Sequence, residues 1–234
     1  MPKSTSSGKC RLCGELFAKA QMTRHLKSCL SRTEAEGKSG KAGAPCFHLL
    51  VEATYIPIMW LHLEVPGSTL FGQLDRVLRD IWLECCGHMS AFRFPEKAAS
   101  SQRLMMDVEK QMREERKLMS VEVGKRLEPK MKLSYEYDFG STTDLTIRVV
   151  EERPNTLDSP ARIRLLARNE PPDLLCVDCG KPAKLICVEC AWESDGTYCT
   201  RCGKKHECGE DMLVPVVNSP RMGVCGYTGP SVEP

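Results

Sequence analysis

Hydrophobic and polar residues alternate along two neighbouring stretches in the middle of the chain. In residues 47–53 and again in residues 59–65, apolar side chains occupy every second position, and Pro57 lies in the break between the stretches. A period of two is typical of a β-strand with one buried face, and a proline-containing break favours a turn. The pattern predicts a β-hairpin over residues 47–65.

The spacing of apolar residues changes to three and four immediately after this hairpin. It places Leu70, Leu74, Leu78 and Trp82 on one stripe of a helix, and Ser68 can cap its N-terminus. Period two returns in three later stretches, residues 88–94, 133–139 and 145–149. The last two predict a second hairpin, and we expect the helix to lie across the sheet that the strands form.

Most of the candidate metal ligands lie in the C-terminal part of the chain. Three Cys-x-x-Cys pairs are followed by a histidine and two more cysteines: Cys176/Cys179, Cys187/Cys190, Cys199/Cys202, His206, Cys208 and Cys225. Two residues between cysteines let one backbone turn aim both thiolates at one ion, and four such ligands complete a tetrahedral zinc site. The array predicts two zinc sites and one surplus ligand candidate.

Two pairings of these ligands are compatible with their spacing. In a cross-brace, the first and third pairs bind one ion, while Cys187 and Cys190 bind the other with Cys225 and either His206 or Cys208. A sequential arrangement joins the first two pairs instead, and the short gap between those pairs favours the cross-brace. An iron–sulfur cluster would use the same thiolates, but a histidine candidate favours zinc.

A separate ligand pattern lies near the N-terminus, where Cys10, Cys13, His25 and Cys29 have the spacing of a Cys2HisCys zinc finger. A histidine and a cysteine four residues apart lie on one face of a helix, and the cysteine pair approaches from a short hairpin. We therefore expect a finger over residues 1–30 and about three zinc ions in the whole chain.

The finger region is also the basic part of the chain. Residues 1–45 hold nine Lys and Arg against three acids, whereas residues 46–152 hold fourteen against seventeen. The expected finger helix offers four polar side chains to a polyanion: Lys19, Gln21, Arg24 and Lys27. One finger reads about three base pairs, so nucleic-acid binding, a protein contact and a purely structural role all stay open.

Cysteine usage and hydropathy bear on the compartment. The first eight residues contain no apolar signal region, and no apolar run approaches membrane-spanning length. We therefore expect a cytoplasmic protein with reduced, metal-bound cysteines and no membrane partner.

Four short segments of the central region form a recognisable set: Pro57-x-x-Trp60, Leu74-x-x-Val77-Leu78, His88-Met-x-x-Phe92 and Tyr135-Glu-Tyr-Asp-Phe-Gly140. Over residues 46–152 the chain resembles, through these segments and most specifically through the last, the plasmid pRiA4b open-reading-frame-three-like family. The resemblance implies an α+β domain with a β-grasp-like mixed sheet, found in prokaryotic genomes and on mobile elements, and it implies no established activity. The family's motif continues with an acid, a tryptophan and a histidine, where this chain has Ser141-Thr-Thr-Asp144-Leu. Segments 167–172 and 218–227 also look like a longer subfamily with an appended zinc domain, which supports Cys225 as a ligand.

These predictions combine into an α+β protein with a β-grasp-like mixed sheet, a crossing helix and flanking zinc modules. The expected parts are a Cys2HisCys finger at 1–30, a flexible linker at 31–44, the α+β domain at 45–152, a connector at 153–172 and a Cys-rich two-zinc module at 173–234.

The expected function is binding, not catalysis. Four-ligand zinc sites have no open position, and the chain has no His-Glu-x-x-His helix, phosphate loop or Gly-x-Ser-x-Gly elbow. We predict a binding or adaptor protein for a protein or a nucleic acid, with no evident small-molecule substrate. The alternative is an enzyme that uses Glu136 and Asp138, or Cys85 and His88 as a thiol with its base, although Cys85 and its neighbour Cys86 are more typical of buried structural cysteines.

Overall fold

The computed structural model describes residues 6–36, 43–95, 108–155, 162–192 and 196–230. The chain divides into two compact units, each assembled from several segments. The first unit comprises Met1–Val77, Ser90–Glu136 and Asp144–Asn169, and the second comprises Leu78–Met89, Tyr137–Thr143 and Glu170–Pro234. The expected finger therefore belongs to the first unit, and two segments from the middle of the chain belong to the second.

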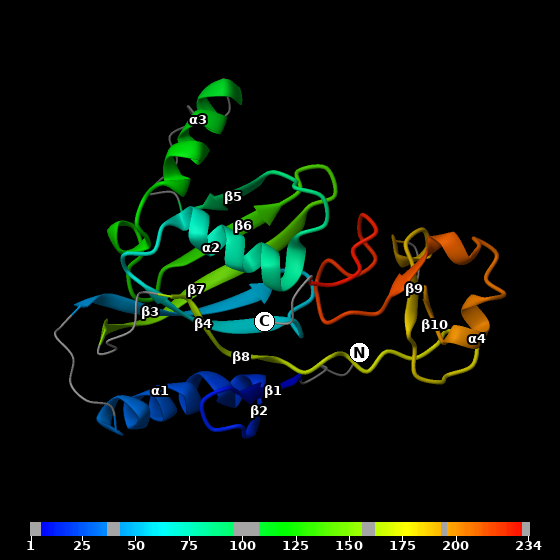
Figure 1. Ribbon diagram of the computed structural model, residues 1–234, viewed down its shortest axis with the longest axis horizontal. Helices are drawn as coiled ribbons and strands as arrows, with labels where there is room; N and C mark the ends of the chain where they lie inside the picture. The colour runs from blue at the N-terminus through cyan, green and yellow to red at the C-terminus, as the bar shows by residue number, and fades with distance from the viewer. Residues whose placement is uncertain (1–5, 37–42, 96–107, 156–161, 193–195, 231–234) are drawn as a thin grey trace. The chain divides into compact units, whose positions relative to one another are not determined.

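The first unit is built on an eight-stranded sheet with the strand order β2-β1-β8-β4-β3-β7-β6-β5 (Figure 1). Its strands are β1 Ser7–Cys10, β2 Leu16–Ala18, β3 Gly43–Ala53, β4 Trp60–Pro66, β5 Ser90–Arg93, β6 Lys132–Tyr137, β7 Thr143–Asn155 and β8 Arg164–Asn169. The pairings from β2 through β7 in this order are antiparallel. The α+β class is confirmed. The mixed sheet is corrected to an antiparallel one over these strands, and the β-grasp arrangement stays a prediction.

The first predicted hairpin is formed by β3 and β4. Leu49 pairs with Leu63 and Val51 with Leu61, so one apolar side chain lies opposite another on the same face of the sheet. The second predicted hairpin is formed by β6 and β7, which are neighbours in the sheet. Period-two alternation located these strands because each presents one apolar face to a core.

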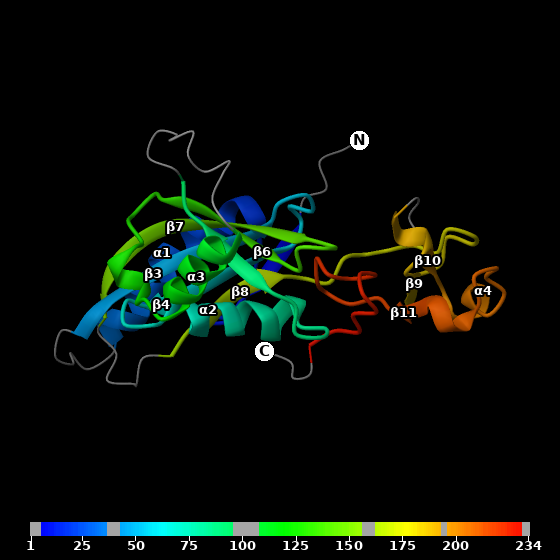
Figure 2. The same ribbon diagram turned by 90° about the horizontal axis from the view of Figure 1, so that it is seen from above.

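Two helices cover opposite faces of this sheet (Figures 1 and 2). Helix α1, Lys19–Glu36, packs Met22 and Leu26 against Trp60. Helix α2, Phe71–Leu78, lies on the other face, where the rings of Phe71 and Phe92 are 5.1 Å apart. Because α1 continues to Glu36, it occupies the first part of the expected linker.

The polar positions of the first hairpin do not face solvent, as their alternation would suggest. His48 and His62 are fully buried beneath α1, and their ring nitrogens lie 2.8 Å apart. Burial lowers the pKa of His48 to about 3 and also lowers the pKa of His62, so both rings are neutral. Lys19 of α1 forms an ion pair of 2.6 Å with Glu52 of β3. The finger helix supplies a second cover for this sheet, which sequence alternation alone could not reveal.

Two further helical segments differ in detail from expectation. The predicted helix over 68–82 consists of α2 followed by a π-helical turn at Arg79–Leu83. Within the charged stretch 96–119 the structure has α3, Val108–Met119, and residues 96–107 lie outside the described part. Among the described residues, no helix combines the length and apolar character needed to cross a bilayer.

The second unit contains a small sheet with the strand order β10-β9-β11. Its elements are β9 Leu185–Cys187, β10 Thr197–Tyr198, α4 Thr200–Gly203 and β11 Leu213–Pro215. The buried cluster beside this sheet consists of Cys176, Cys187 and Tyr198, with three further cysteines and Leu213 packed against it. Five of the seven residues in this cluster are therefore cysteines.

Candidate metal centres

The structure gathers thirteen of the fourteen cysteines and three of the five histidines into four groups. The groups are Cys10, Cys13, His25 and Cys29; Cys85, Cys86, His88 and Cys225; Cys176, Cys179, Cys199 and Cys202; and Cys187, Cys190, His206 and Cys208. Within each group the four ligand atoms lie within 4.8 Å of one another. Each group could hold a metal ion.

The distances inside the groups match the edges of a small tetrahedron. With Zn–S of about 2.3 Å and Zn–N of about 2.0 Å, a tetrahedral site has S···S edges of about 3.8 Å and S···N edges of about 3.5 Å. The Sγ atoms of Cys179 and Cys199 lie 3.7 Å apart, and those of Cys190 and Cys208 lie 3.8 Å apart. The separation of Cys190 Sγ from His206 Nε2 is 3.5 Å. The donor sets therefore fit an ion of this size.

The finger group is positioned by β1, its turn and α1. The amide of Gly14 donates to the carbonyl of Cys10 at 2.9 Å, which closes the turn between the two cysteines. The ring of Phe17 stacks on that of His25 with 3.8 Å between centroids, and His25 Nε2 lies 3.4 Å from Cys13 Sγ. The sequence-predicted ligand set is brought together here. Its strand β1 pairs with β8, so the finger is an extension of the large sheet.

The Cys176 group has the expected cross-brace pairing of the first and third Cys-x-x-Cys pairs. The turn after Cys176 repeats the finger turn, since the amide of Gly180 donates to the Cys176 carbonyl at 2.9 Å. Burial raises the pKa of the Cys176 thiol, but hydrogen bonds from the backbone amides of Cys199, Cys179 and Asp178 outweigh it and lower the pKa to about 6. Backbone donors thus favour the thiolate that a metal ion requires.

The Cys187 group shows which residues lie with the second Cys-x-x-Cys pair, Cys187 and Cys190. Both His206 and Cys208 lie with Cys187 and Cys190, so the alternative between them does not arise. The ring of His206 packs against Tyr198 with 4.4 Å between centroids. Burial raises the pKa of Cys187, but the backbone amide of Cys190 and the His206 ring lower it to about 7.

The prediction that Cys225 completes the Cys187 group is wrong. The hydroxyl of Ser219 donates to the carbonyl of Trp82 at 2.6 Å, which holds this part of the tail beside the 78–89 segment. Cys225 therefore lies with Cys85, Cys86 and His88 instead. The residues that the structure describes accordingly contain four candidate groups, not the expected three.

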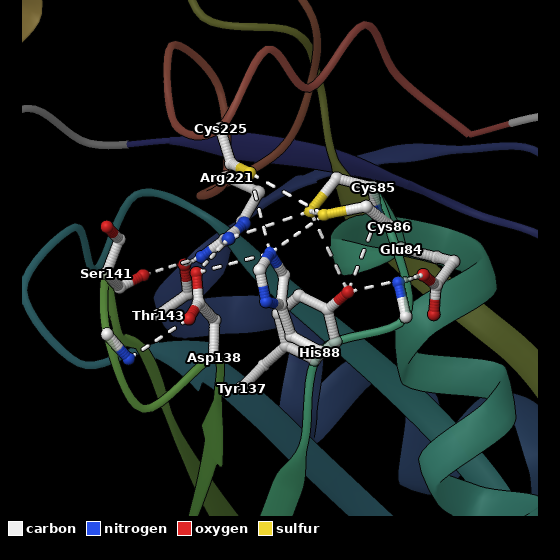
Figure 3. Close-up of polar contacts among 12 residues, drawn as sticks. Glu84, Cys85, Cys86, His88, Tyr137, Asp138, Ser141, Thr143, Arg221 and Cys225 are labelled. Atoms are coloured by element: carbon white, nitrogen blue, oxygen red, sulfur yellow. Dashed lines mark hydrogen bonds and ion pairs between the residues drawn. The ribbon is translucent and has the colours of Figure 1, made fainter.

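The fourth group has no Cys-x-x-Cys spacing and was not predicted as a ligand set. Its four side chains point toward one another in Figure 3. Cys86 Sγ lies 3.7 Å from both Cys85 Sγ and Cys225 Sγ, while His88 Nε2 lies 3.4 Å from Cys225 Sγ and 2.9 Å from Cys86 Sγ. Cys86 and Cys225 are exposed and the other two are half-buried, which corrects the expectation of buried structural cysteines at 85 and 86.

A buried arginine lies beside this group. Arg221 is fully buried and donates to Asp138 Oδ2 at 2.5 Å, to the carbonyl of Ser141 at 2.6 Å and to Cys85 Sγ at 3.6 Å. Burial raises the pKa of Asp138, but hydrogen bonds from Arg221 and from the amides of Gly140 and Ser141 outweigh it and lower the pKa. Asp138 Oδ2 is also 3.6 Å from His88 Nε2.

Tyr137 and Glu84 complete the surroundings of the fourth group. The Tyr137 hydroxyl donates to Glu84 Oε1 at 3.3 Å and lies 3.8 Å from Cys85 Sγ. Glu84 Oε1 accepts the amide of Gly87 at 2.6 Å, which shapes the turn between Cys86 and His88. Burial raises the pKa of Cys85, but the hydrogen bond from Arg221 and the contact with the Tyr137 hydroxyl outweigh it and lower the pKa.

Three of the four residues of the enzymatic alternative converge at this fourth group: Cys85, His88 and Asp138. Glu136 does not join them, because it accepts a hydrogen bond of 3.0 Å from Arg93 in the first unit. The signal in the sequence was the run Cys85-Cys86-Gly-His88, whose partner Cys225 lies more than a hundred residues away.

Comparisons with known proteins are sparse. A search of curated protein sequences returned no match. Among solved structures, the crystal structure of a protein of unknown function, MM3350 from Methanosarcina mazei Go1, is similar at 16% identity with a TM-score of 0.41, over 53% of this chain and 68% of that one. The model of the plasmid pRiA4b ORF-3-like family matches residues 48–183, which is more than half of the chain. The chain therefore belongs to the plasmid pRiA4b ORF-3-like protein family.

Proposed function

We propose that this chain is a zinc protein that acts by binding another protein and not by catalysis. The observation that carries this proposal is the tetrahedral spacing of ligand atoms in the three groups that contain a Cys-x-x-Cys pair, which we call the knuckle centres. Each knuckle centre has four protein ligands, so a bound ion has no open position for water or a substrate. Such ions stabilise structure.

The donor chemistry supports zinc as the ion. Thiolate and imidazole donors in tetrahedral sets suit zinc among the divalent ions, and zinc binding commonly supplies the folding free energy of small modules. The buried cluster of the C-terminal module consists mainly of ligand cysteines such as Cys176 and Cys187. Without an ion this module has little apolar surface to hold it together. Zinc thiolates persist in reducing surroundings, which supports a cytoplasmic location.

The surroundings of the finger favour a protein partner over a nucleic acid. Two of the four polar side chains expected to reach phosphates are paired with acids of the sheet, because Lys19 binds Glu52 and Lys27 binds Glu151. The apolar side of α1 is buried against the sheet. Arg24 is exposed, so a nucleic acid bound to this helix would contact the Arg24 side chain.

Cobalt substitution tests whether the knuckle centres are closed. Protein reconstituted with Co²⁺ is expected to show tetrahedral thiolate spectra that do not change when azide or imidazole is added, because no coordination position is open. A spectral change on adding azide would indicate an open site and would favour the enzymatic alternative.

A DNA titration tests the choice of partner. Fluorescence anisotropy with a labelled duplex, at 50 mM and 200 mM salt, is expected to show no saturable binding that depends on Arg24. Binding that falls steeply with salt and is weakened by Arg24→Ala would contradict a protein partner, because phosphate contacts release counterions.

A further inference from the structure

We propose that Cys85, Cys86, His88 and Cys225 form a fourth zinc site, the loop centre, which joins the C-terminal segment 219–227 to the loop 84–89. Both segments belong to the second unit. The inference rests on the proposed function in one respect, namely that the thiols of this protein are reduced and have access to zinc. It goes beyond that function because nothing in the spacing of these residues marks them as a ligand set.

The distances of the loop centre are those of an ion site and not of a disulfide. A disulfide requires an S–S bond of about 2.05 Å, whereas Cys86 Sγ is 3.7 Å from the sulfurs of both Cys85 and Cys225. These separations match the tetrahedral S···S edge of about 3.8 Å. The separation of Cys86 Sγ from His88 Nε2, 2.9 Å, is a hydrogen-bond distance, and it must widen by about 0.6 Å when an ion binds between the two side chains.

The charges around the loop centre fit a divalent cation. With all three thiols ionised, the sulfurs and the Asp138 carboxylate carry four negative charges, and Arg221 supplies one positive charge within reach of Cys85 and Asp138. A divalent ion reduces the remaining charge to −1, which is the charge that a Cys3His zinc site carries by itself. Arg221 and Asp138 thus form a neutral buried pair that positions Cys85 beside the site.

The segment 219–227, which carries Cys225, is held in place by hydrogen bonds that involve no ion. Ser219 donates to the Trp82 carbonyl, and Arg221 donates to the Ser141 carbonyl at 2.6 Å. Cys225 has a φ of 52° and Asp138 a φ of 64°, which are left-handed conformations that non-glycine residues adopt at a cost. The ligand Cys225 is therefore presented by a segment whose geometry is already determined.

The loop centre is also the most accessible of the four groups. Each knuckle centre includes at least one buried cysteine: Cys10, Cys176 or Cys187. In the loop centre the four ligands are exposed or half-buried. Solvent and chelators therefore reach its ion without local unfolding.

Zinc content per chain tests the proposal. Protein purified without added metal is analysed for zinc together with Cys225→Ser, His88→Gln and the control Cys46→Ser, which alters the cysteine outside the four groups. We expect four zinc ions per chain in the wild type and in Cys46→Ser, and three in Cys225→Ser. His88→Gln keeps the thiols and is the second variant if Cys225→Ser fails to fold; it is expected to hold its fourth zinc with a lower affinity, measured by competition with a chelator.

The outcomes separate this inference from the proposed function. Three zinc ions in both the wild type and Cys225→Ser, with unchanged affinity in His88→Gln, would overturn the loop centre and leave the knuckle centres intact. Fewer than three zinc ions in the wild type would overturn the proposed function. A Cys86–Cys225 disulfide, identified by peptide mapping in protein freshly purified without added oxidant or reductant, would likewise overturn the loop centre.

Discussion

The Cys176 centre and the loop centre use the same ligand chemistry but are constructed in opposite ways. In the Cys176 centre, two Cys-x-x-Cys turns bring the ligands together, and backbone amides donate to the Cys176 sulfur. In the loop centre, the ligands come from segments 139 residues apart, and the side chains of Arg221 and Tyr137 approach the Cys85 sulfur. Local spacing determines the first centre, whereas tertiary packing determines the second.

This difference predicts which residues each centre depends on. A centre supported by backbone amides tolerates changes in the side chains around it, but it requires its turn conformation and its ion. A centre supported by side chains can be weakened through residues that are not ligands. The variants below test this distinction, from the largest expected effect to the smallest.

Loss of a knuckle ligand should have the largest effect. We expect Cys176→Ser to lose one zinc ion and to unfold the C-terminal module, because structural zinc contributes on the order of 10 kcal/mol to such folds. Hydrogen exchange of the β9 amides at 185–187 should rise to the rate of an unfolded chain. Cys225→Ser is the matched control, in which the β9 amides should stay protected. Equal exchange rates of the β9 amides in the two variants would contradict the proposed difference between the two centres.

Replacement of the buried Arg221 should destabilise the loop centre although none of its four ligands is mutated. Arg221→Met leaves the Asp138 carboxylate without its partner, which we expect to cost about 3 kcal/mol in the free energy of unfolding. Denaturant unfolding measures this loss, and the exposed Arg24→Met is the control with no expected change. A loss below about 0.5 kcal/mol would show that Asp138 and Arg221 do not act as a buried pair.

Two glycines allow a matched substitution in the two centres. Gly180 follows Cys179 with a φ of 67°, and Gly226 follows Cys225 with a φ of 65°; an added Cβ meets no atom within 4 Å at either position. Each alanine variant should therefore cost about 1 to 2 kcal/mol from backbone strain alone. Gly180→Ala should lower the zinc affinity of the Cys176 centre, and Gly226→Ala that of the loop centre. A reversed pattern in chelator competition would contradict the ligand assignment.

The smallest expected effect concerns the tyrosine beside Cys85. Tyr137→Phe removes the hydroxyl that donates to Glu84, which should cost about 1 kcal/mol and accelerate zinc release from the loop centre only. Tyr55→Phe, at a side chain that is 82% exposed, is the control with no expected change. If Tyr137→Phe accelerated zinc release from the knuckle centres as much as from the loop centre, Tyr137 would not act locally on the loop centre.

Sequence patterns predicted the elements that depend on neighbouring residues. Alternation located the β3–β4 hairpin, and Cys-x-x-Cys spacing located the pairs of the knuckle centres, because a turn of fixed length brings such residues together whatever the rest of the chain does. Glycine follows four cysteines of the C-terminal array, and φ is positive at three of these glycines: Gly180, Gly209 and Gly226. Gly203 instead lies in α4, where a Cβ would meet Leu185 and Leu213 at 3.0 Å.

The remaining features depend on contacts between distant segments, which spacing does not encode. The polar positions His48 and His62 looked like a solvated strand face, and they are buried because α1 packs over them. Cys225 looked like a ligand of the adjacent Cys187 group, and it lies with Cys85 and Cys86 because Arg221 and Ser219 direct its segment elsewhere. A ligand left over after the Cys-x-x-Cys pairs are satisfied is a signal to search for partners far along the chain.

Time-resolved zinc release tests the central claim most directly. Zinc-loaded protein is mixed with excess chelator, and the metal released per chain is followed over time in the wild type and in Cys225→Ser. The two kinds of centre predict one zinc ion released in a fast phase and three in a slow phase, with the fast phase absent from Cys225→Ser. Release of all zinc in one phase, or a fast phase that persists in Cys225→Ser, would contradict the existence of a separate, accessible loop centre.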